Sequence, residues 1–236
     1  MRTLAVVPIK SLANAKQRLA ATLAGGSRRS LVQAMFSDVL ASLRRCEGLD
    51  AIVVVTDDAA AESLAAGDGV AVLPDDRQVG QSEATATGIA YAGAHGFDRV
   101  LLVPGDTPLL DAVEIEDLLM RSERDEIGVA IVPDRHGTGT NALLIAPPGA
   151  FEPSFGPGSL DRHVSAARAG GLVHRVEPVP SMALDVDTPD DLAALWGVVD
   201  SSRRGAGRTR GALKQLERAG VRAALTGSRG RQTVGA

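Results

Sequence analysis

The sequence predicts an α/β protein in which helices flank a mostly parallel central sheet on both faces. Short runs of β-branched and aliphatic residues alternate with amphipathic stretches along residues 1–200, as expected for strands joined through crossover helices. The chain has 236 residues, of which 44% are hydrophobic, enough to bury one substantial core. Only 3% of the residues are aromatic, so Ala, Val, Leu and Ile must fill that core.

Eight segments have the composition of strands. Five successive β-branched runs come first and three runs follow in a less regular second half; they span 4–9, 51–56, 70–73, 99–103, 127–132, 141–146, 172–177 and 182–186. Ligands of open α/β sheets bind beyond the carboxyl ends of the strands. Candidate functional residues are therefore expected directly after these runs.

The most clearly marked helix lies between the first two strands. Large apolar residues recur there at helical spacing and form one stripe, made of Leu31, Val32, Met35, Phe36, Val39, Leu40 and Leu43. Further helical stretches end near residue 95 and cover 112–121, 159–169 and 188–199.

The formal net charge of −4 conceals two different regions. Residues 1–200 carry 16 basic and 28 acidic side chains, whereas residues 201–236 carry 9 basic side chains and 1 acidic side chain. The second region is rich in Gly, Ser and Arg, a composition that does not compensate for the entropy of ordering. We therefore predict one domain over residues 1–200 and a disordered basic tail over 201–236, with at most a short helix around 212–225. A contact with nucleic acid or an acidic neighbour is the alternative role for this tail.

Composition also disfavours several classes of function. Scarce aromatic residues argue against a protein that stacks on single-stranded nucleic acid, so no nucleic-acid partner is expected. No apolar run approaches the roughly 20 residues of a membrane span, and no cleavage site follows the first apolar run. A single cysteine, Cys46, excludes an internal disulfide. We expect a cytoplasmic protein with no membrane partner, and a homodimer is left open.

Three cations follow the first strand, in the segment PIKSLANAKQRLA. Lys10, Lys16 and Arg18 lie within nine residues on a strand-to-helix connection. Lysine supplies a point charge and arginine a planar fork, a combination suited to a polyphosphate. A solvated basic helix face is the alternative. Neither the GxxxxGKS loop nor the GxGxxG turn is present, so the ATPase and dinucleotide fingerprints do not apply.

Carboxylates follow two other strands. Asp106 lies in LLVPGDTPLL, just past the fourth strand, where it could hold Mg²⁺ or simply cap a turn. Asp185 and Asp187 lie in LDVDTPDDL, on one face of an expected strand, and two such carboxylates repel unless a cation or proton lies between them. Helix capping is the alternative for this second segment. The coincidence of carboxylates at two strand ends favours a metal site.

Two glycine-rich polar segments, HGTGTNALL and FGPGSLDRH, lie between these carboxylates. Glycines allow close approach of the backbone to a ligand, and Ser159 is expected to be the N-cap of a helix whose exposed amides could bind an anion. Ordinary loop and cap chemistry is the alternative for each segment. The four histidines have neither ligand-like spacing nor a nucleophile motif nearby, which disfavours a zinc hydrolase and a catalytic triad.

The motifs VVPIKSLANAKQRL, LLVPGDTPLL, GTGTNALL, FGPGS and LDVDTPDDL occur in this order over nearly all of residues 1–200. In this the chain resembles the guanylyltransferases of coenzyme F-420 biosynthesis, which act on 2-phospho-L-lactate or phosphoenolpyruvate. The resemblance implies a Rossmann-like nucleotidyltransferase fold. It also implies Mg²⁺ as cofactor, GTP as donor substrate and one of these phospho-acids as acceptor.

The resemblance also assigns roles, motif by motif. Lys10, Lys16 and Arg18 would hold the GTP phosphates, and Asp106 would bind Mg²⁺ together with Asp187, or with Asp185 as the alternative. The acceptor would be held by Thr140, Gly156 and Ser159. Many relatives have a GLN-type turn for the base, and this chain has Gly80, Gln81 and Ser82 in VGQSEA, so Gly80 and Ser82 would bind the nucleotide.

The reaction favoured by these observations is transfer of GMP from GTP to phosphoenolpyruvate, giving enolpyruvoyl-diphospho-5'-guanosine and diphosphate. The Ala-rich and Arg-rich composition, which resembles that of a high-GC actinomycete, favours this acceptor over 2-phospho-L-lactate. Two rival functions are a glycosyltransferase that uses the Asp-Val-Asp segment to hold a sugar nucleotide, and a non-catalytic nucleotide-binding module.

Overall fold

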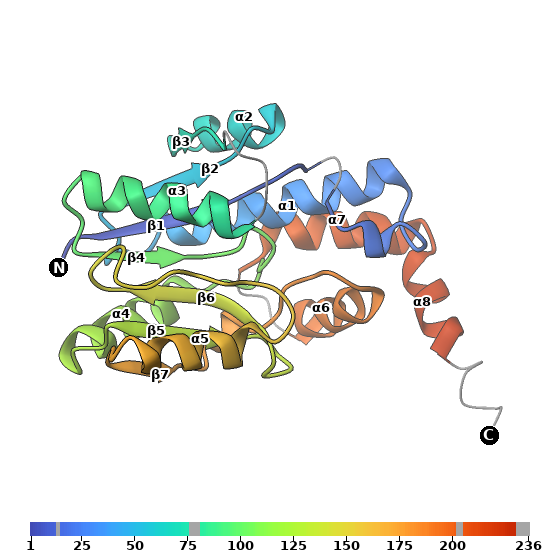
Figure 1. Ribbon diagram of the computed structural model, residues 1–236. Helices are drawn as coiled ribbons and strands as arrows, with labels where there is room; N and C mark the ends of the chain where they lie inside the picture. The colour runs from blue at the N-terminus through green and yellow to red at the C-terminus, as the bar shows by residue number, and fades with distance from the viewer. Residues whose placement is uncertain (13–14, 76–80, 202–204, 230–236) are drawn as a thin grey trace, which may run out of the picture.

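A computed structural model describes the whole chain except residues 13–14, 76–80, 202–204 and 230–236 (Figure 1). Seven strands form one sheet in the order β3-β2-β1-β4-β6-β5-β7. The strands are β1 (Thr3–Pro8), β2 (Ala51–Val55), β3 (Ala71–Leu73), β4 (Arg99–Leu102), β5 (Val129–Pro133), β6 (Thr140–Ile145) and β7 (His174–Val176).

Eight α-helices and two short 3₁₀ helices lie between or after the strands in the described part of the chain. The α-helices are α1 (Gly25–Leu43), α2 (Ala59–Gly67), α3 (Gln81–Ala94), α4 (Ala112–Arg124), α5 (Ser159–Ala169), α6 (Pro189–Ser201), α7 (Gly207–Arg218) and α8 (Val221–Arg229). The 3₁₀ helices are η1 (Gln17–Leu19) and η2 (Pro180–Met182). Among the described residues, none of the helices combines the length and the apolar character that a membrane span requires.

Alternating strand residues divide the core into two layers. On β1, Ala5 and Val7 belong to a cluster built with α1, α2, α4, α6 and α7, whereas Leu4 and Val6 belong to a cluster built with α3 and α5. Helices therefore cover both faces of the sheet, and β1, β4, β5 and β6 are buried on both sides. The predicted α/β class with a mostly parallel sheet is confirmed.

One strand runs against the others and brings two parts of the chain to the same edge. β6 is antiparallel to both β4 and β5, while the β1–β2, β1–β4, β2–β3 and β5–β7 pairs are parallel. Its first residue, Thr140, pairs with Pro133 at the carboxyl end of β5. Thr140 thus lies at the sheet edge where β1 and β4 also end.

The stripe predicted between residues 31 and 43 is the buried face of α1. Seven of the eight expected strands are present, with small shifts at their ends. The expected strand over 182–186 is wrong: the segment continues η2 without pairing to the sheet, although Leu184 and Val186 are buried. Its alternating pattern arises because the two side chains enter the core from a loop.

The expected disorder of the tail is also wrong for residues 205–229, which include α7 and α8. α7 lies along α1 (Figure 1) and buries Leu213 and Leu216. Its first turn is held by the buried Asp38 carboxylate of α1, which accepts hydrogen bonds from the Arg208 and Thr209 amides at 3.1 and 2.7 Å. An amphipathic stripe and a buried partner for the helix amides outweigh the unfavourable composition.

We expect Leu213→Ala to lower the free energy of unfolding by about 2–5 kcal/mol, because it removes a fully buried side chain from the α1–α7 contact. Lys214→Ala, at the exposed neighbouring position, should change it by less than about 0.5 kcal/mol. Urea unfolding of both variants measures the difference. Equal stabilities would contradict the packing of α7 on the domain.

Candidate active site at the sheet edge

A lysine joins two of the predicted carboxylates. Lys16 lies in the segment that joins β1 to η1, which we call the β1 loop. Its Nζ donates hydrogen bonds to Asp106 Oδ2, after β4, and to Asp187 Oδ1 at 2.6 Å, before α6. The Lys16 side chain is only 7% exposed. Three segments far apart in the sequence therefore converge on one ammonium group at the carboxyl edge of the sheet.

The electrostatics show that this cluster holds excess negative charge. Burial opposes the Lys16 charge, but the Asp106 and Asp187 carboxylates outweigh burial and raise the lysine pKa above its ordinary value. Burial, and then the charges of Asp106 and Asp187, raise the pKa of Asp185 to about 6. A further positive charge would be favourable here. The described His, Cys, Asp and Glu residues include no group of three or more placed to hold a metal ion.

The turn that carries Asp106 is packed tightly against β1. A Cβ added to Gly105 would collide with Ile9 Cδ1 and come within 3.3 Å of Phe36 Cδ2, so a larger residue there would displace the Ile9 side chain. The neighbouring Asp106 carboxylate has one oxygen bonded to Lys16, while its Oδ1 is buried without a hydrogen-bond partner. A buried oxygen without a partner is unfavourable unless another group donates a hydrogen bond to it or a cation binds it.

Two cavities meet at this cluster, and both are lined by Pro104, Asp106 and Asp187. The first, of about 510 Å³, is bordered by the β1 loop with Lys10, Ser11 and Lys16, and by apolar residues that include Ile9, Leu12 and Val32. The second, of about 470 Å³, is more polar and is bordered by Arg18, by the glycine-rich segments and by Asp185. We call them the lysine cavity and the threonine cavity.

The predicted site residues divide between these cavities. Lys10 and Lys16 line the lysine cavity, whereas Arg18 lines the threonine cavity, on the other side of the carboxylates. All three predicted acceptor residues line the threonine cavity; they are Thr140, Gly156 and Ser159. Gly80 lies outside the described residues. Ser82 is at the start of α3 and does not border either cavity in the described part of the chain.

Three side chains outside the predicted site residues fix the loops of this site. Asp58 accepts a hydrogen bond from the Leu12 amide at 3.0 Å and so holds the β1 loop. Asn141 donates to the carbonyls of Met182 and Ala183 at 2.8 and 3.1 Å, which anchors the segment before Asp185. Polar residues buried beside a strand end are the signal that could have found Asn141.

The third of these side chains is Asp191, in the first turn of α6. Its Oδ2 accepts hydrogen bonds from the Asp187 amide, the Thr188 amide and the Thr188 hydroxyl, at 3.1, 2.7 and 2.7 Å. Its Oδ1 pairs with Arg135 at 2.5 Å. The helix-capping alternative is therefore realised by Thr188 and Asp191, and this cap leaves the Asp187 carboxylate turned toward Lys16.

The start of α5 does not present free amides to the threonine cavity, and its N-cap is Gly158, with Ser159 the first helical residue. The Ser159 amide donates to the Gly156 carbonyl at 3.0 Å and the Leu160 amide donates to the Thr138 carbonyl at 3.2 Å, so two amides at the start of α5 are already engaged. The Ser159 hydroxyl accepts from the Thr140 amide at 2.9 Å. The Thr140 hydroxyl lies 2.9 Å from Nδ1 of the buried His163.

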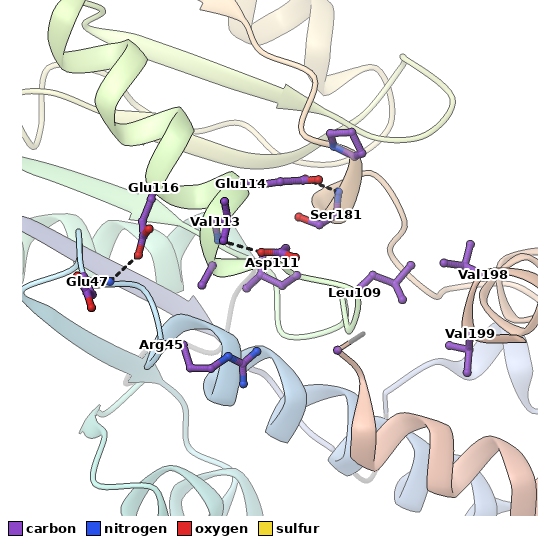
Figure 2. A pocket seen from close by; sticks show the side chains of 14 residues that line it. Arg45, Glu47, Leu109, Asp111, Val113, Glu114, Glu116, Ser181, Val198 and Val199 are labelled. Carbon is purple, nitrogen blue, oxygen red and sulfur yellow. Dashed lines mark hydrogen bonds between the residues drawn. The ribbon is translucent and has the colours of Figure 1, made fainter. Parts of the chain in front are cut away.

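A larger cavity of about 710 Å³ lies elsewhere, between the start of α4, η2 and the end of α6 (Figure 2). Its carboxylates already serve the fold: Asp111 caps the Val113 amide, Glu114 accepts from the Ser181 amide, and Glu116 accepts from the Glu47 amide. None of the predicted catalytic or binding residues lines it. Its size alone does not make it the reaction site.

Comparison with known proteins assigns this architecture. The family model "Guanylyl transferase CofC like" matches residues 3–204. The chain belongs to this guanylyltransferase family. A phosphoenolpyruvate guanylyltransferase from Conexibacter woesei is 47% identical over 218 residues, which cover 92% of this chain and 98% of that protein. One from Sphaerobacter thermophilus is 42% identical over 84% of this chain and 94% of that protein.

Solved structures agree on the fold. A cytidylyltransferase from Leptospira borgpetersenii has a TM-score of 0.58 at 12% identity and covers 93% of this chain and 95% of its own. A 4-diphosphocytidyl-2C-methyl-D-erythritol synthase has a TM-score of 0.59 at 14% identity, over 84% of this chain and 99% of that chain. The predicted nucleotidyltransferase fold is confirmed.

The His163 ring gives the site a pH-dependent stability. Burial, and then the Arg162 charge, lower its pKa to about 4 from the ordinary 6.5. Between these values the unfolded chain binds a proton that the folded protein does not, so stability falls as pH falls from about 6.5 to 4. We expect this loss to be up to about 3 kcal/mol larger in the native chain than in His163→Gln.

Urea unfolding at pH 7.5 and 4.5 measures this loss. His95→Gln changes an exposed histidine and should keep the native difference between the two pH values. If His163→Gln keeps it as well, His163 is not the residue responsible.

Proposed function

We propose that this guanylyltransferase transfers GMP from GTP to phosphoenolpyruvate, giving enolpyruvoyl-diphospho-5'-guanosine and diphosphate, in coenzyme F-420 biosynthesis. The observation that carries the proposal is the pair of cavities that share Asp106 and Asp187. A transfer between two phosphate-bearing substrates needs both of them against one charged centre. The names of the relatives support the choice of acceptor.

The division of residues supports one orientation of the substrates. The lysine cavity combines cations with apolar walls and suits a nucleotide, so Lys10 and Lys16 would stabilise the negative charge of the leaving diphosphate. The threonine cavity would take the acceptor, with hydroxyls from Thr140 and Ser159 and the open backbone at Gly156, where φ is 109°. Arg18 borders this second cavity and would neutralise the acceptor phosphate.

The chemistry requires no general base from the protein. The second pKa of a phosphomonoester is about 6, so the attacking phosphate oxygen is already ionised at neutral pH. It attacks the α-phosphorus of GTP, the bond from that phosphorus to the bridging oxygen breaks, and diphosphate leaves. Positioning and charge neutralisation by these side chains then supply the catalysis.

The residues present fit a magnesium ion. Lys16 Nζ contacts both Asp106 and Asp187, which shows that one cation can reach both carboxylates, and the orphaned Asp106 Oδ1 is an oxygen that lacks a partner. We therefore assign Asp106 and Asp187 as the residues that would hold Mg²⁺, with Asp185 nearby. When bound, the ion would neutralise phosphate charge between the two substrates.

The direct test is diphosphate release from GTP and Mg²⁺ with phosphoenolpyruvate or 2-phospho-L-lactate supplied separately. We expect release that depends on phosphoenolpyruvate. Release only with 2-phospho-L-lactate would change the acceptor and keep the reaction. Absence of release with both, from folded protein whose product is trapped by the next enzyme, would overturn the proposal.

Asp106→Asn should reduce turnover about a thousandfold while the fold is retained, because the neutral amide is a poor partner for both Lys16 and Mg²⁺. Asp117→Asn, at an exposed carboxylate on α4 that pairs with Arg121, is the matched control and should keep native activity. Diphosphate release and circular dichroism measure the two properties. An active Asp106→Asn with native Mg²⁺ dependence would contradict the metal assignment.

Asp191→Asn should raise the Mg²⁺ concentration for half-maximal activity about tenfold. The change weakens the Arg135 pair and the hydrogen bonds that orient the Asp187 backbone, without removing the carboxylates themselves. Asp190→Asn, next in sequence and exposed, should leave this concentration unchanged. Titration of activity with Mg²⁺ separates the outcomes, and equal midpoints for both variants would refute a positioning role for Asp191.

A further inference from the structure

We propose that His163 is a positioning residue that turns the Thr140 hydroxyl into a hydrogen-bond donor for the anionic acceptor. This inference rests on the proposed function, because it concerns how the threonine cavity recognises its substrate. It adds a residue outside the set assigned by the sequence motifs. His163 is fully buried and does not itself border the cavity.

The hydrogen bonds fix the tautomer of the His163 ring. The Ser154 backbone amide donates to Nε2 at 2.8 Å, so Nε2 must carry a lone pair. In a neutral imidazole the proton then lies on Nδ1. Nδ1–H therefore donates to the Thr140 hydroxyl oxygen, 2.9 Å away. The low pKa of the buried ring is consistent with the neutral state.

The consequence is that the Thr140 hydroxyl is biased toward donating a hydrogen bond to the substrate. Because Thr140 Oγ1 accepts from His163, its own proton is left for another acceptor. The Ser159 hydroxyl has the same bias, since it accepts from the Thr140 amide. Both residues line the threonine cavity, and a phosphate or carboxylate oxygen at neutral pH accepts hydrogen bonds and rarely donates.

The ring is also held in place by packing. Phe151 and Phe155 meet it edge-on, with centroids 5.6 and 5.4 Å away. Phe155 lines the threonine cavity, so the same ring supports a wall of the site. A purely structural role, in which His163 only fastens the loop at Ser154, is the rival explanation. The two roles use opposite nitrogens of the ring and can be separated.

Two substitutions separate these roles. The amide nitrogen of Asn can take the place of Nδ1–H, so His163→Asn keeps the donor to Thr140 and loses the acceptor for Ser154. The longer Gln side chain can reach the place of Nε2, so His163→Gln keeps that acceptor and loses the donor. We expect His163→Gln to raise the KM for the acceptor about tenfold, with the KM for GTP unchanged, and His163→Asn to change either KM less than about threefold.

A double-mutant cycle with Thr140→Val tests the route of the effect. If His163 acts through the Thr140 hydroxyl, His163→Gln should add less than about twofold to the acceptor KM of Thr140→Val. A full tenfold increase in both backgrounds, or equal effects of the Gln and Asn variants, would overturn the proposal in favour of a structural role.

A measurement without turnover keeps this inference distinct from the proposed function. The ¹⁵N shifts of the His163 ring should show a protonated Nδ1 and an unprotonated Nε2 at pH 7. The opposite tautomer would overturn the inference even in an active enzyme. If the native protein has this tautomer but releases no diphosphate with either acceptor, the proposed function fails and the hydrogen-bond geometry stands.

Discussion

The structure depends on holding carboxylates from separate segments close together at one edge of the sheet. Asp106 and Asp187 repel each other, and the fold brings them to a single lysine whose side chain is almost fully buried. The burial that strengthens this attraction also removes water from the charges, so the geometry must be set by the surrounding chain. A further positive charge would therefore be favourable at this cluster.

Hydrogen bonds between side chains and the backbone around the cluster maintain that geometry. Asp58 anchors the β1 loop, Asn141 anchors the segment before Asp185, and Asp191 anchors the backbone of Asp187. Each anchor bonds a backbone group, so the loops that carry the charged side chains are fixed by contacts other than the Lys16 ion pairs. The reversed direction of β6 has the same effect on a larger scale, because it places Thr140 at the edge where the parallel strands end.

Periodicity was sufficient to predict the fold class and most strands, because buried strands and the α1 stripe have strong local patterns. It failed at 182–186, where alternating side chains enter the core from a loop, and at α7, whose order depends on the distant Asp38. The motifs predicted residues of both cavities, but spacing could not reveal that Arg18 lies apart from Lys10 and Lys16. Which cavity each cation lines is determined by how the loops fold in three dimensions.

A neutral histidine is well suited to a site with this charge. Protonated, it would attract the carboxylates and compete with the cations that the phosphates require, but burial keeps its pKa low. The ring can then donate a hydrogen bond without bringing charge, through Thr140, to the side of the cluster opposite Lys10. His163 thus orients the Thr140 hydroxyl without adding charge to a cluster that already holds Lys16, Asp106 and Asp187.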